Sequence, residues 1–323
     1  MISIVVVSWN SGGDLEECVE SLAAARGRSP ESAELILVDN HSERPPGEEI
    51  RRRWPDVRLA ILSENIGFGP GVNHGAAHAR GDVLLFVNPD ARATGDAFGA
   101  IAAAFAAHRD WVAVAPRLVA PRAPEGLPRP DPLPRGEGDE TQETFQLRRL
   151  PTLRQAAREL LLIDRAFPRN RGRARDRYLD RDREEEFEVE QPAAAVLAVR
   201  RDAFARVGGF DPRFVPAWWE DVDLCARLRS AGKIVYFPGA VFEHAGGASM
   251  HRLGYDRFLP IYYRNAIAYW RKHRGAAIAL LFRALVAAGM VLRVLLLPFR
   301  RNMPRPRREA LRAYRRAFGA ALS

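Results

Sequence analysis

Cysteine is nearly absent from this 323-residue chain, which contains only Cys18 and Cys225. No CxxC pair or ladder of cysteine and histidine accompanies them, so a disulfide framework and a structural zinc site are both excluded. Two isolated cysteines are typical of a reducing compartment, and we expect a cytoplasmic protein. The first ten residues lack the basic stretch and small-residue cleavage site of a secretory signal, which favours the same compartment.

A GxGxxG motif is also missing after the first apolar run, where a dinucleotide-binding oxidoreductase would carry it. This absence argues against that enzyme class. The overall composition, 47% hydrophobic and 28% charged, is that of a globular protein rather than a disordered, collagen-like or polytopic membrane chain.

Negative charge is scarce at the carboxyl-terminal end. Residues 1–250 hold 33 basic and 38 acidic side chains, whereas residues 251–323 hold 16 basic and only 2 acidic ones. A basic tail on a mildly acidic body indicates an anionic partner, either a membrane surface or nucleic acid. No nucleic-acid-binding fold signature is present, so we expect an anionic membrane surface and no nucleic acid.

Short apolar runs alternate with helical patterns in the first third of the chain. The runs at 2–7, 35–38, 57–62 and 83–87 predict strands, and the spacing at 14–25 and 71–80 predicts helices. This alternation is typical of a mainly parallel sheet, in which ligands bind beyond the carboxyl ends of the strands. Each of those ends carries a polar cluster here, which points to a small-molecule site.

The remaining chain suggests four regions. Residues 1–115 form the first half, and 116–190 form a variable insertion that opens with seven prolines between Pro116 and Pro134. The pattern resumes in 191–270, with strands at 193–199 and 234–237 and helices to residue 207 and over 221–231. Residues 271–323 form basic amphipathic helices.

An apolar segment at 276–299 is interrupted only by Arg283 and Arg293. Two arginines ten residues apart disfavour a simple membrane span, because a central arginine costs a few kcal/mol on insertion. We expect an interfacial helix that buries one face in the membrane and keeps both arginines at the level of the lipid headgroups. A core helix of a soluble protein is the alternative.

Several carboxylates and one histidine stand where strands end or helices begin: Asp39, Asp90, Glu220, Asp221 and His244. A single such residue is more often a turn former or a helix cap than a catalytic group. Their shared position at one edge of a parallel sheet is what makes them candidates. Asp223, in the same cluster as Asp221, is expected to cap its helix.

Six segments in this order carry a family resemblance: VVVSWN (5–10), VDNHS (38–42), NIGFG (65–69), FVNPD (86–90), VGGFD (207–211) and WEDVDLC (219–225). Together they resemble glycosyltransferase family 2, the inverting enzymes of GT-A fold, and are most similar to its rhamnosyltransferase-like branch. The resemblance covers roughly residues 1–270. It implies an α/β fold with a mainly parallel central sheet flanked by helices, followed here by a helical, membrane-associating carboxyl-terminal segment.

The resemblance implies a donor site for a nucleotide-diphosphate sugar, with dTDP-rhamnose favoured and a UDP-sugar next. Asp39 would bind the nucleotide, as the equivalent residue of the family does. The loop at 65–68 contains a glycine, which would let its backbone approach the donor closely. An ordinary turn is the alternative. The full set of nucleotide-sugar-binding candidates is Ser8, Trp9, Asn10, Asp39, Asn65, Gly67, Phe68, Asn73, Asn88 and Asp90.

Two residues resemble the metal ligands of the family. Asp90 corresponds to the last residue of its DxD motif, and His244 resembles its later histidine ligand. Asn88 stands where many members have the first aspartate, so one negative charge is missing. Oxygen ligands and phosphate suit Mg²⁺ or Mn²⁺.

Asp221 matches the catalytic position of the family and is expected to be the general base that accepts the proton of the acceptor hydroxyl. Glu220 is a second catalytic candidate that would also bind acceptor hydroxyls. Trp218 and Trp219 would offer a flat surface to a sugar ring, with core packing as the equal alternative. The QxxRW signature of processive members is absent, which favours transfer of a single sugar.

We therefore expect an inverting glycosyltransferase that adds one sugar to a cell-surface polysaccharide or a lipid-linked glycan precursor. It would be cytoplasmic and peripheral on the inner face of the plasma membrane. The acceptor would be contacted mainly by residues 116–190 and the carboxyl-terminal part. The competing hypothesis is a non-catalytic protein that binds membrane or nucleic acid through its basic tail.

Overall fold

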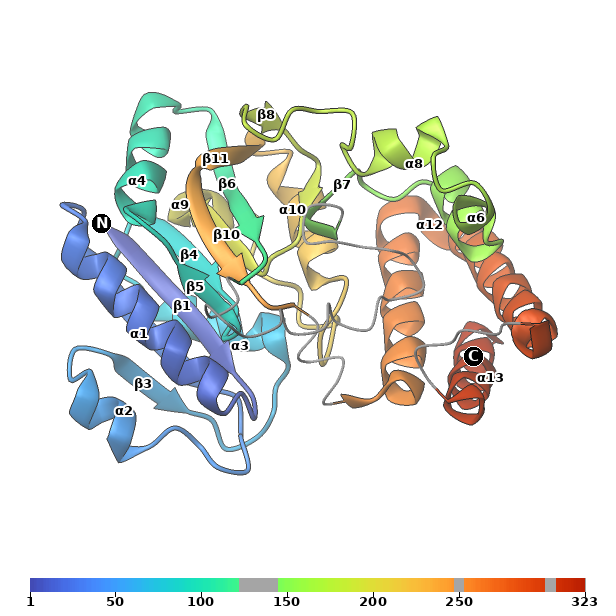
Figure 1. The fold of residues 1–323 in the computed structure, drawn as a ribbon, viewed down its shortest axis with the longest axis horizontal. Helices are drawn as coiled ribbons and strands as arrows, with labels where there is room; N and C mark the ends of the chain where they lie inside the picture. Colours follow the sequence, from blue (N-terminus) through green and yellow to red (C-terminus); the bar gives the residue numbers. More distant parts are fainter. Residues whose placement is uncertain (122–144, 247–252, 300–305, 323) are drawn as a thin grey trace, which may run out of the picture. The chain divides into compact units, whose positions relative to one another are not determined.

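The computed structural model describes residues 1–121, 145–246, 253–299 and 306–322 (Figure 1). These residues fold into two compact units. The first contains residues 1–121, 145–148 and 181–246, and the second contains residues 149–180, 253–299 and 306–322. The four-region division drawn from the sequence stays a prediction, and its insertion at 116–190 includes residues 122–144, which lie outside the described part.

One sheet forms the centre of the first unit. Within the described residues it has nine strands in the order β3-β2-β1-β4-β10-β6-β11-β5, with β8 paired to β11. The strands of its first half are parallel: β3 (Arg58–Ile61), β2 (Ala33–Asp39), β1 (Ile2–Ser8) and β4 (Val83–Val87). The side chains of β1 and β4 are buried throughout, as expected for parallel strands covered on both faces.

The second half of the sheet is mixed. β10 (Val196–Arg200) runs antiparallel to β4 and to β6 (Trp111–Val119), and β11 (Lys233–His244) runs parallel to β6. The short strands β5 (Ala91–Ala93) and β8 (Phe187–Glu188) run antiparallel to β11. The expected α/β fold with a central sheet is confirmed, and its parallel part is the half built from the amino-terminal motifs.

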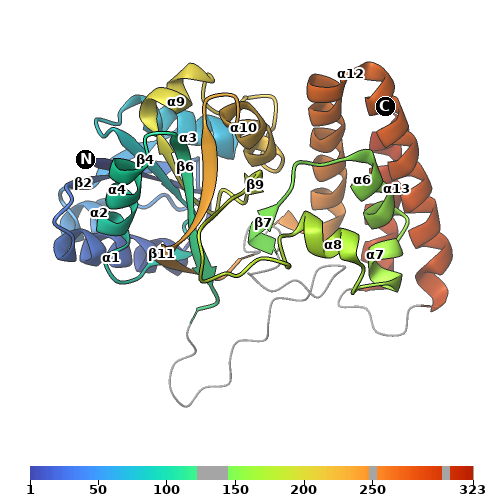
Figure 2. The same ribbon diagram turned by 90° about the horizontal axis from the view of Figure 1, so that it is seen from above.

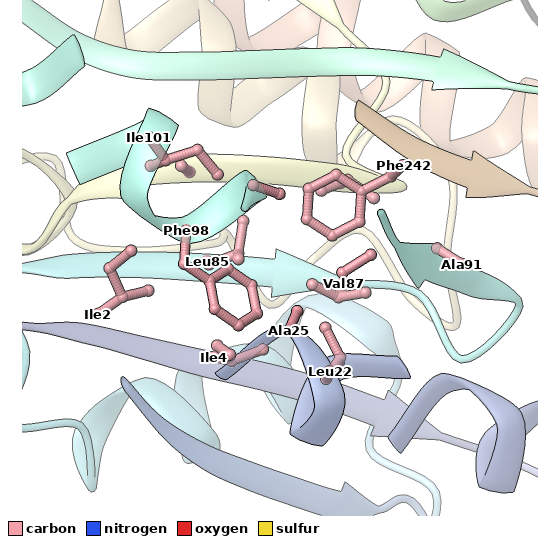
Figure 3. Packing of buried hydrophobic residues seen from close by; sticks show 14 of the residues in the cluster. Ile2, Ile4, Leu22, Ala25, Leu85, Val87, Ala91, Phe98, Ile101 and Phe242 are labelled. Atoms are coloured by element: carbon pink, nitrogen blue, oxygen red, sulfur yellow. The ribbon is translucent and has the colours of Figure 1, made fainter. Parts of the chain in front are cut away.

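Helices cover both faces of this sheet (Figure 2). On one face, α1 (Gly13–Arg28) and α4 (Ala97–Ala107) pack Leu22, Phe98 and Ile101 against Ile4 and Leu85 of the strands (Figure 3). On the other face lie α3 (Phe68–Ala77) and α9 (Arg201–Arg206).

The second face is closed by aromatic rings. The ring of Phe86 on β4 lies 5.2 Å from that of Phe204 on α9 and 5.5 Å from that of Phe210, measured between centroids. The first unit is completed by α2 (Glu48–Arg53), α10 (Glu220–Leu228) and a separate two-stranded sheet of β7 (Leu147–Arg148) and β9 (Gln191–Pro192).

The second unit is helical in its described residues. It consists of α6 (Leu153–Leu160), α7 (Ile163–Ala166), α8 (Arg171–Asp176), α12 (Tyr255–Leu296), the 3-10 turn η1 (Leu297–Phe299) and α13 (Arg307–Leu322). α12 breaks at Gly275, whose φ of 83° is left-handed. The rings of Trp270 and Phe282 stack with their centroids 5.1 Å apart, whereas twelve residues of straight helix would rise about 18 Å. The chain therefore folds back at Gly275.

Arg283 and Arg293 of α12 bind backbone carbonyls inside this unit. Arg283 donates from Nε to the Ala321 carbonyl of α13 at 2.7 Å. Arg293 is 6% exposed and donates to the Leu160 carbonyl at 2.6 Å, at the end of α6. The expectation that both arginines reach lipid headgroups is therefore wrong, because each satisfies a carbonyl that a helix end leaves without an intrahelical partner.

By length and hydropathy alone, one helix among the described residues, Tyr255–Phe299, could cross a membrane. Its most apolar window has a mean hydropathy of 2.2, and 33% of that window is buried. Length and composition do not by themselves show an association with membrane.

The contact between α3 and the sheet gives a stability prediction. A Cβ on Gly75 would lie 2.5 Å from Cγ1 of Val5 and 3.2 Å from Cγ2 of Val38. Gly75→Ala should therefore destabilise the first unit by ~1–3 kcal/mol, as overpacking of a filled core does. Thermal unfolding followed by circular dichroism measures the effect as a lower Tm.

Gly27→Ala is the matched control, because Gly27 lies in α1 and a Cβ there meets no atom within 4 Å. The control should keep or slightly raise Tm, since alanine is the better helix former by ~1 kcal/mol. Equal Tm shifts in the two variants would contradict the packing argument.

Candidate active site

The loop after β2 is shaped by Asp39. Its side chain is fully buried, Oδ1 accepts a hydrogen bond from Ser42 Oγ at 2.6 Å, and Oδ2 accepts one from the Ser42 amide at 3.0 Å. The carboxylate thus closes a tight turn. The contact of Asp39 with a nucleotide stays a prediction. Such a contact would use the lone pairs of the Asp39 oxygens that do not accept hydrogen bonds from Ser42.

The loop after β1 is tied to the same turn. The Asn10 amide donates to Ser42 Oγ at 2.8 Å, and Asn10 Oδ1 accepts from the Glu43 amide at 2.8 Å. Ser8 pairs with Asp39 in the parallel ladder and is buried, whereas Trp9 is partly exposed. The first two motifs therefore form one connected edge.

Asn40 extends that edge to the loop after β3. Its Nδ2 donates to Asn65 Oδ1 at 3.0 Å, and its Oδ1 accepts from the Ile66 amide at 3.0 Å. Asn65 Oδ1 also accepts from the Gly67 amide at 3.0 Å. Sequence reasoning quoted Asn40 within a motif without giving it a role. Its place directly after a strand-end aspartate was the available signal.

The loop at 65–68 contacts the segment that leads to the acidic cluster. The Phe68 amide donates to the Pro216 carbonyl at 2.7 Å. Gly67 has a φ of 90°, and a Cβ there would lie 2.8 Å from Cγ1 of Val215. Only glycine fits this conformation without strain and this close approach.

Asn73, on α3, holds a second connection between the same two parts of the sequence. Its Nδ2 donates to the Phe210 carbonyl at 2.8 Å, and its Oδ1 accepts from the Phe210 amide at 2.8 Å. The structure thus gives the Asn73 amide a role within the fold. Its contact with the donor stays a prediction.

Asp90 and His244 lie side by side. The pairing of β5 with β11 places His244 opposite Ala91, and the Ala245 amide donates to the Asp90 carbonyl at 3.1 Å. His244 Nε2 lies 3.3 Å from Asp90 Oδ1, and the two side chains are only 4% and 8% exposed. A residue pair 154 positions apart in sequence is thus brought together as expected.

This pair suits a divalent cation, since it offers a carboxylate oxygen and an imidazole nitrogen on a rigid strand pair. In the described part of the chain no group of three or more metal-binding side chains occurs. An ion held by Asp90 and His244 would therefore take its other ligands from the diphosphate of the donor and from water. Asn88, partly exposed at the end of β4, adds no negative charge.

The acidic cluster opens α10. Trp218 and Trp219 before it both have left-handed backbones, with φ of 72° and 75°. The Glu220 side chain is buried, and its Oε2 has no hydrogen-bond partner among the described residues. Burial first, and the neighbouring Asp221 second, raise the pKa of Glu220 well above its usual range.

Asp221 is partly buried, and several donors hold its carboxylate. Oδ1 accepts from the Val222 amide at 2.8 Å, Oδ2 lies 3.4 Å from Gln191 Nε2, and the Ala194 amide also donates to it. Burial raises the pKa of Asp221, and these amides and the charge of Arg148 oppose the rise. A carboxylate held in this way keeps its orientation and can still accept a proton.

Ala194 and Ala195 link the two chemical centres. The Asn88 amide donates to the Ala195 carbonyl at 2.8 Å, and the amide of the preceding Ala194 binds Asp221. The FVNPD motif and the acidic cluster therefore meet across one dipeptide of the first unit.

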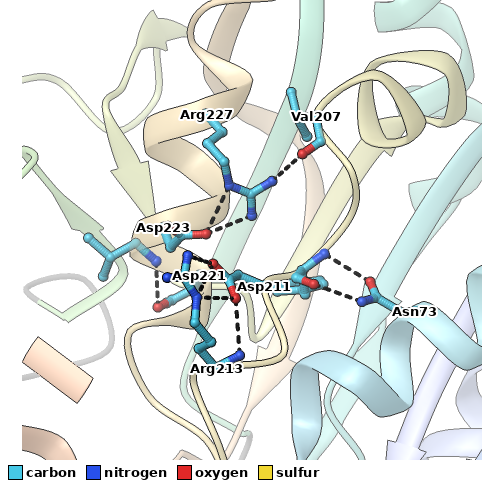
Figure 4. A network of polar contacts seen from close by, with 9 residues as sticks. Asn73, Val207, Asp211, Arg213, Asp221, Asp223 and Arg227 are labelled. Atoms are coloured by element: carbon cyan, nitrogen blue, oxygen red, sulfur yellow. Dashed lines mark hydrogen bonds and ion pairs between the residues drawn. The ribbon is translucent and has the colours of Figure 1, made fainter. Parts of the chain in front are cut away.

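Asp223 does not cap α10, so that expectation is wrong. It is fully buried, and its Oδ2 lies 2.7 Å from a guanidinium nitrogen of Arg227, which also donates to the Val207 carbonyl at 2.6 Å (Figure 4). A side chain one turn into the helix points to the neighbouring turn rather than to the helix start.

The two tryptophans differ in exposure. Trp219 is buried, whereas Trp218 is partly exposed. Trp218 is thus the more accessible of the two residues. Sugar binding by either ring stays a prediction.

Comparison with known proteins shows the family of the chain. The model of glycosyl transferase family 2 matches residues 3–175. A curated relative, the N-acetylglucosaminyl-diphospho-decaprenol L-rhamnosyltransferase of Mycobacterium tuberculosis, is 29% identical over 256 residues, which cover 76% of each chain.

Solved structures agree on the fold. Mannosyltransferase PcManGT of Pyrobaculum calidifontis, in complex with GDP-Man and Mn²⁺, superposes with a TM-score of 0.53 at 15% identity, over 99% of this chain and 85% of that one. GalNAc-T7 with UDP, GalNAc and Mn²⁺ gives 0.55 at 17% identity, over 82% of this chain and 47% of that one. This chain thus spans less than half of GalNAc-T7, and at these identities the likeness shows the fold alone. With a family match over more than half its length and the GT-A fold around its motifs, the chain belongs to glycosyl transferase family 2 and is a glycosyltransferase.

Proposed function

We propose that this glycosyltransferase moves one sugar, with inversion, from a nucleotide-diphosphate sugar to a hydroxyl of a lipid-linked glycan precursor. A dTDP-rhamnose donor is favoured over a UDP-sugar. The mycobacterial relative is an L-rhamnosyltransferase that acts on N-acetylglucosaminyl-diphospho-decaprenol, which supports rhamnose as the sugar and a lipid-linked glycan as the acceptor. For such an acceptor we propose a peripheral location on the inner face of the plasma membrane.

The observation that carries the proposal is the Ala194–Ala195 link between the Asn88-Pro89-Asp90 turn and Asp221. An inverting transfer needs a site for the diphosphate and a base on opposite sides of the reacting carbon. The dipeptide contacts both through its backbone, at Asn88 through the Ala195 carbonyl and at Asp221 through the Ala194 amide, and this supports a diphosphate site and a base that lie next to each other.

Asp221 would accept the proton of the acceptor hydroxyl as its oxygen bonds to the anomeric carbon. The bond from that carbon to the diphosphate breaks, and the nucleoside diphosphate leaves. A Mg²⁺ or Mn²⁺ ion bound by Asp90 and His244 would neutralise the charge that develops on the diphosphate. Glu220, beside the base, would donate a hydrogen bond to an acceptor oxygen while protonated.

The base assignment predicts the effect of Asp221→Asn. Turnover should fall by at least ~10²-fold, the low end for loss of a positioned proton acceptor, with donor affinity nearly unchanged. Asp202→Asn, at an exposed acid on α9, is the control and should retain activity. If Glu220→Gln is inactive while Asp221→Asn keeps its activity, the general base is Glu220 and not Asp221.

Arg148 predicts a change in pH dependence. Its positive charge lowers the pKa of Asp221, so Arg148→Gln should raise that pKa. Because the base must be ionised, the acid limb of kcat against pH should move to higher pH. Arg149→Gln removes the neighbouring charge and should leave the limb in place. If the acid limb of kcat against pH is at the same pH in Arg148→Gln as in the parent, the charge of Arg148 does not affect the pKa of Asp221.

The metal assignment predicts loss of activity in EDTA and recovery with Mn²⁺ or Mg²⁺. His244→Ala should raise the half-saturating Mn²⁺ concentration by at least about tenfold, whereas His78→Ala, at an exposed position, should not. Full activity in EDTA would remove both Asp90 and His244 from the proposal.

A further inference from the structure

Exposed apolar side chains are concentrated in the second unit. Large hydrophobic residues of the described part that are exposed include only three from the first unit, Met1, Ile61 and Phe145. Six come from a short stretch of α12 and η1, and the most exposed of these are Leu280 at 65%, Leu295 at 64% and Phe299 at 80%. Single exposed apolar residues need no explanation, but a cluster marks an interaction surface.

These side chains lie on one face of the helix. Steps of three or four residues connect the exposed positions, which we call the apolar stripe: Leu280, Leu281, Ala284, Ala288, Val291, Leu295, Leu296 and Phe299. The opposite face is buried through Phe282, Val286 and Met290 and contributes to the core of the unit. The apolar stripe is therefore not needed for that core.

Both arginines of this stretch point away from the apolar stripe. Arg283 and Arg293 are held by the carbonyls of Ala321 and Leu160. The stripe consequently carries no charge along its length, and its basic residues lie at its two ends. Arg271 and Arg274 precede the break at Gly275, and at the other end Arg307 lies 3.4 Å from the Pro298 carbonyl.

No acidic residue occurs from residue 257 to residue 308, a stretch that contains twelve basic ones. An apolar surface on a segment whose own charged residues are all basic complements a partner with an apolar interior and an anionic surface. A second copy of the chain fits poorly, because a symmetric contact would bring like charges together.

We propose that the apolar stripe lies flat on an anionic lipid bilayer and buries its side chains at the level of the upper acyl chains. The helix does not span the bilayer, because its other face is packed against α13 and α6, and α13 exposes Arg308, Arg312, Arg315 and Arg316. The surface itself stands on the exposure and charge described above. Its purpose, access to a lipid-linked acceptor, rests on the proposed function.

The test is flotation of the full chain with vesicles of phosphatidylglycerol or phosphatidylcholine, with no nucleotide present. The chain should float with phosphatidylglycerol and much less with phosphatidylcholine. Binding should weaken with salt but keep a residual part, since the apolar contribution is not screened. Failure to float with phosphatidylglycerol at low salt would overturn the proposal.

The double variant Leu280→Gln with Leu295→Gln tests the face. Vesicle partitioning should fall at least about tenfold, while Tm is kept because both side chains are exposed. Ile61→Gln changes a side chain that is 48% exposed in the first unit and should bind like the parent chain. Unchanged partitioning of the double variant would overturn the assignment of the apolar stripe.

Two further outcomes would replace the bilayer surface by another arrangement. Resistance of the chain to carbonate extraction from cell membranes would indicate a span. If the parent chain forms a dimer and the double variant is a monomer, the apolar stripe is an interface between two copies of the chain. Donor hydrolysis measured without vesicles should be the same in the double variant and the parent. Absence of donor hydrolysis in the parent would contradict the transferase proposal, whereas absence of flotation would contradict the membrane surface, so the two failures are distinguishable.

Discussion

The register of β1 with its two parallel neighbours is the constraint on which the site depends. Ser8 pairs with Asp39, and Val6 pairs with Val87, so the three strands end within two residues of one another and their loops leave from the same edge. Both faces of these strands are buried, and a slip by one residue would exchange the side chains packed against the two helical layers. The motif residues therefore meet because the core fixes the register, and they need little attraction of their own.

Most buried polar groups at this edge have partners that shape the site. The oxygens of Asp39 bind Ser42 within the same loop, the amides of Asn40 and Asn73 bind other loops, and the carboxylate of Asp223 binds Arg227 one turn along the same helix. Such residues make the site rigid, which is what positioning a donor and an acceptor requires. Glu220 differs, because its Oε2 finds no partner among the described residues. A buried carboxyl with a raised pKa and spare bonding capacity next to the candidate base is typical of reactive sites.

The local hydrophobic pattern predicted those strands and helices that have turn-forming residues at both ends. The run at 83–87 has turn signals on both sides, and β4 has the same bounds. β6 was not predicted, since it continues through Pro116 to Val119, and β11 extends past Pro238 and Gly239 because pairing with β6 resumes after a register shift. The motif residues of the site came from the resemblance. Asn40 stood in one of these motifs without a role, and Arg148 and Gln191 were not predicted, because their contacts with Asp221 depend on tertiary structure that the local sequence does not encode.

The arginines of α12 show why hydropathy could not choose between a span, an interfacial helix and a core helix. Each of these is consistent with an apolar run that contains two charges. The distinction lies in where the guanidinium groups go, and Arg293 binds a carbonyl 133 residues away in sequence. Carbonyls at a helix end need donors, and a cation there also complements the helix dipole. Once Arg283 and Arg293 are used in this way, the segment has an uncharged outer face although its composition is mixed. The polarity of a surface helix is therefore set by its tertiary partners as much as by its sequence.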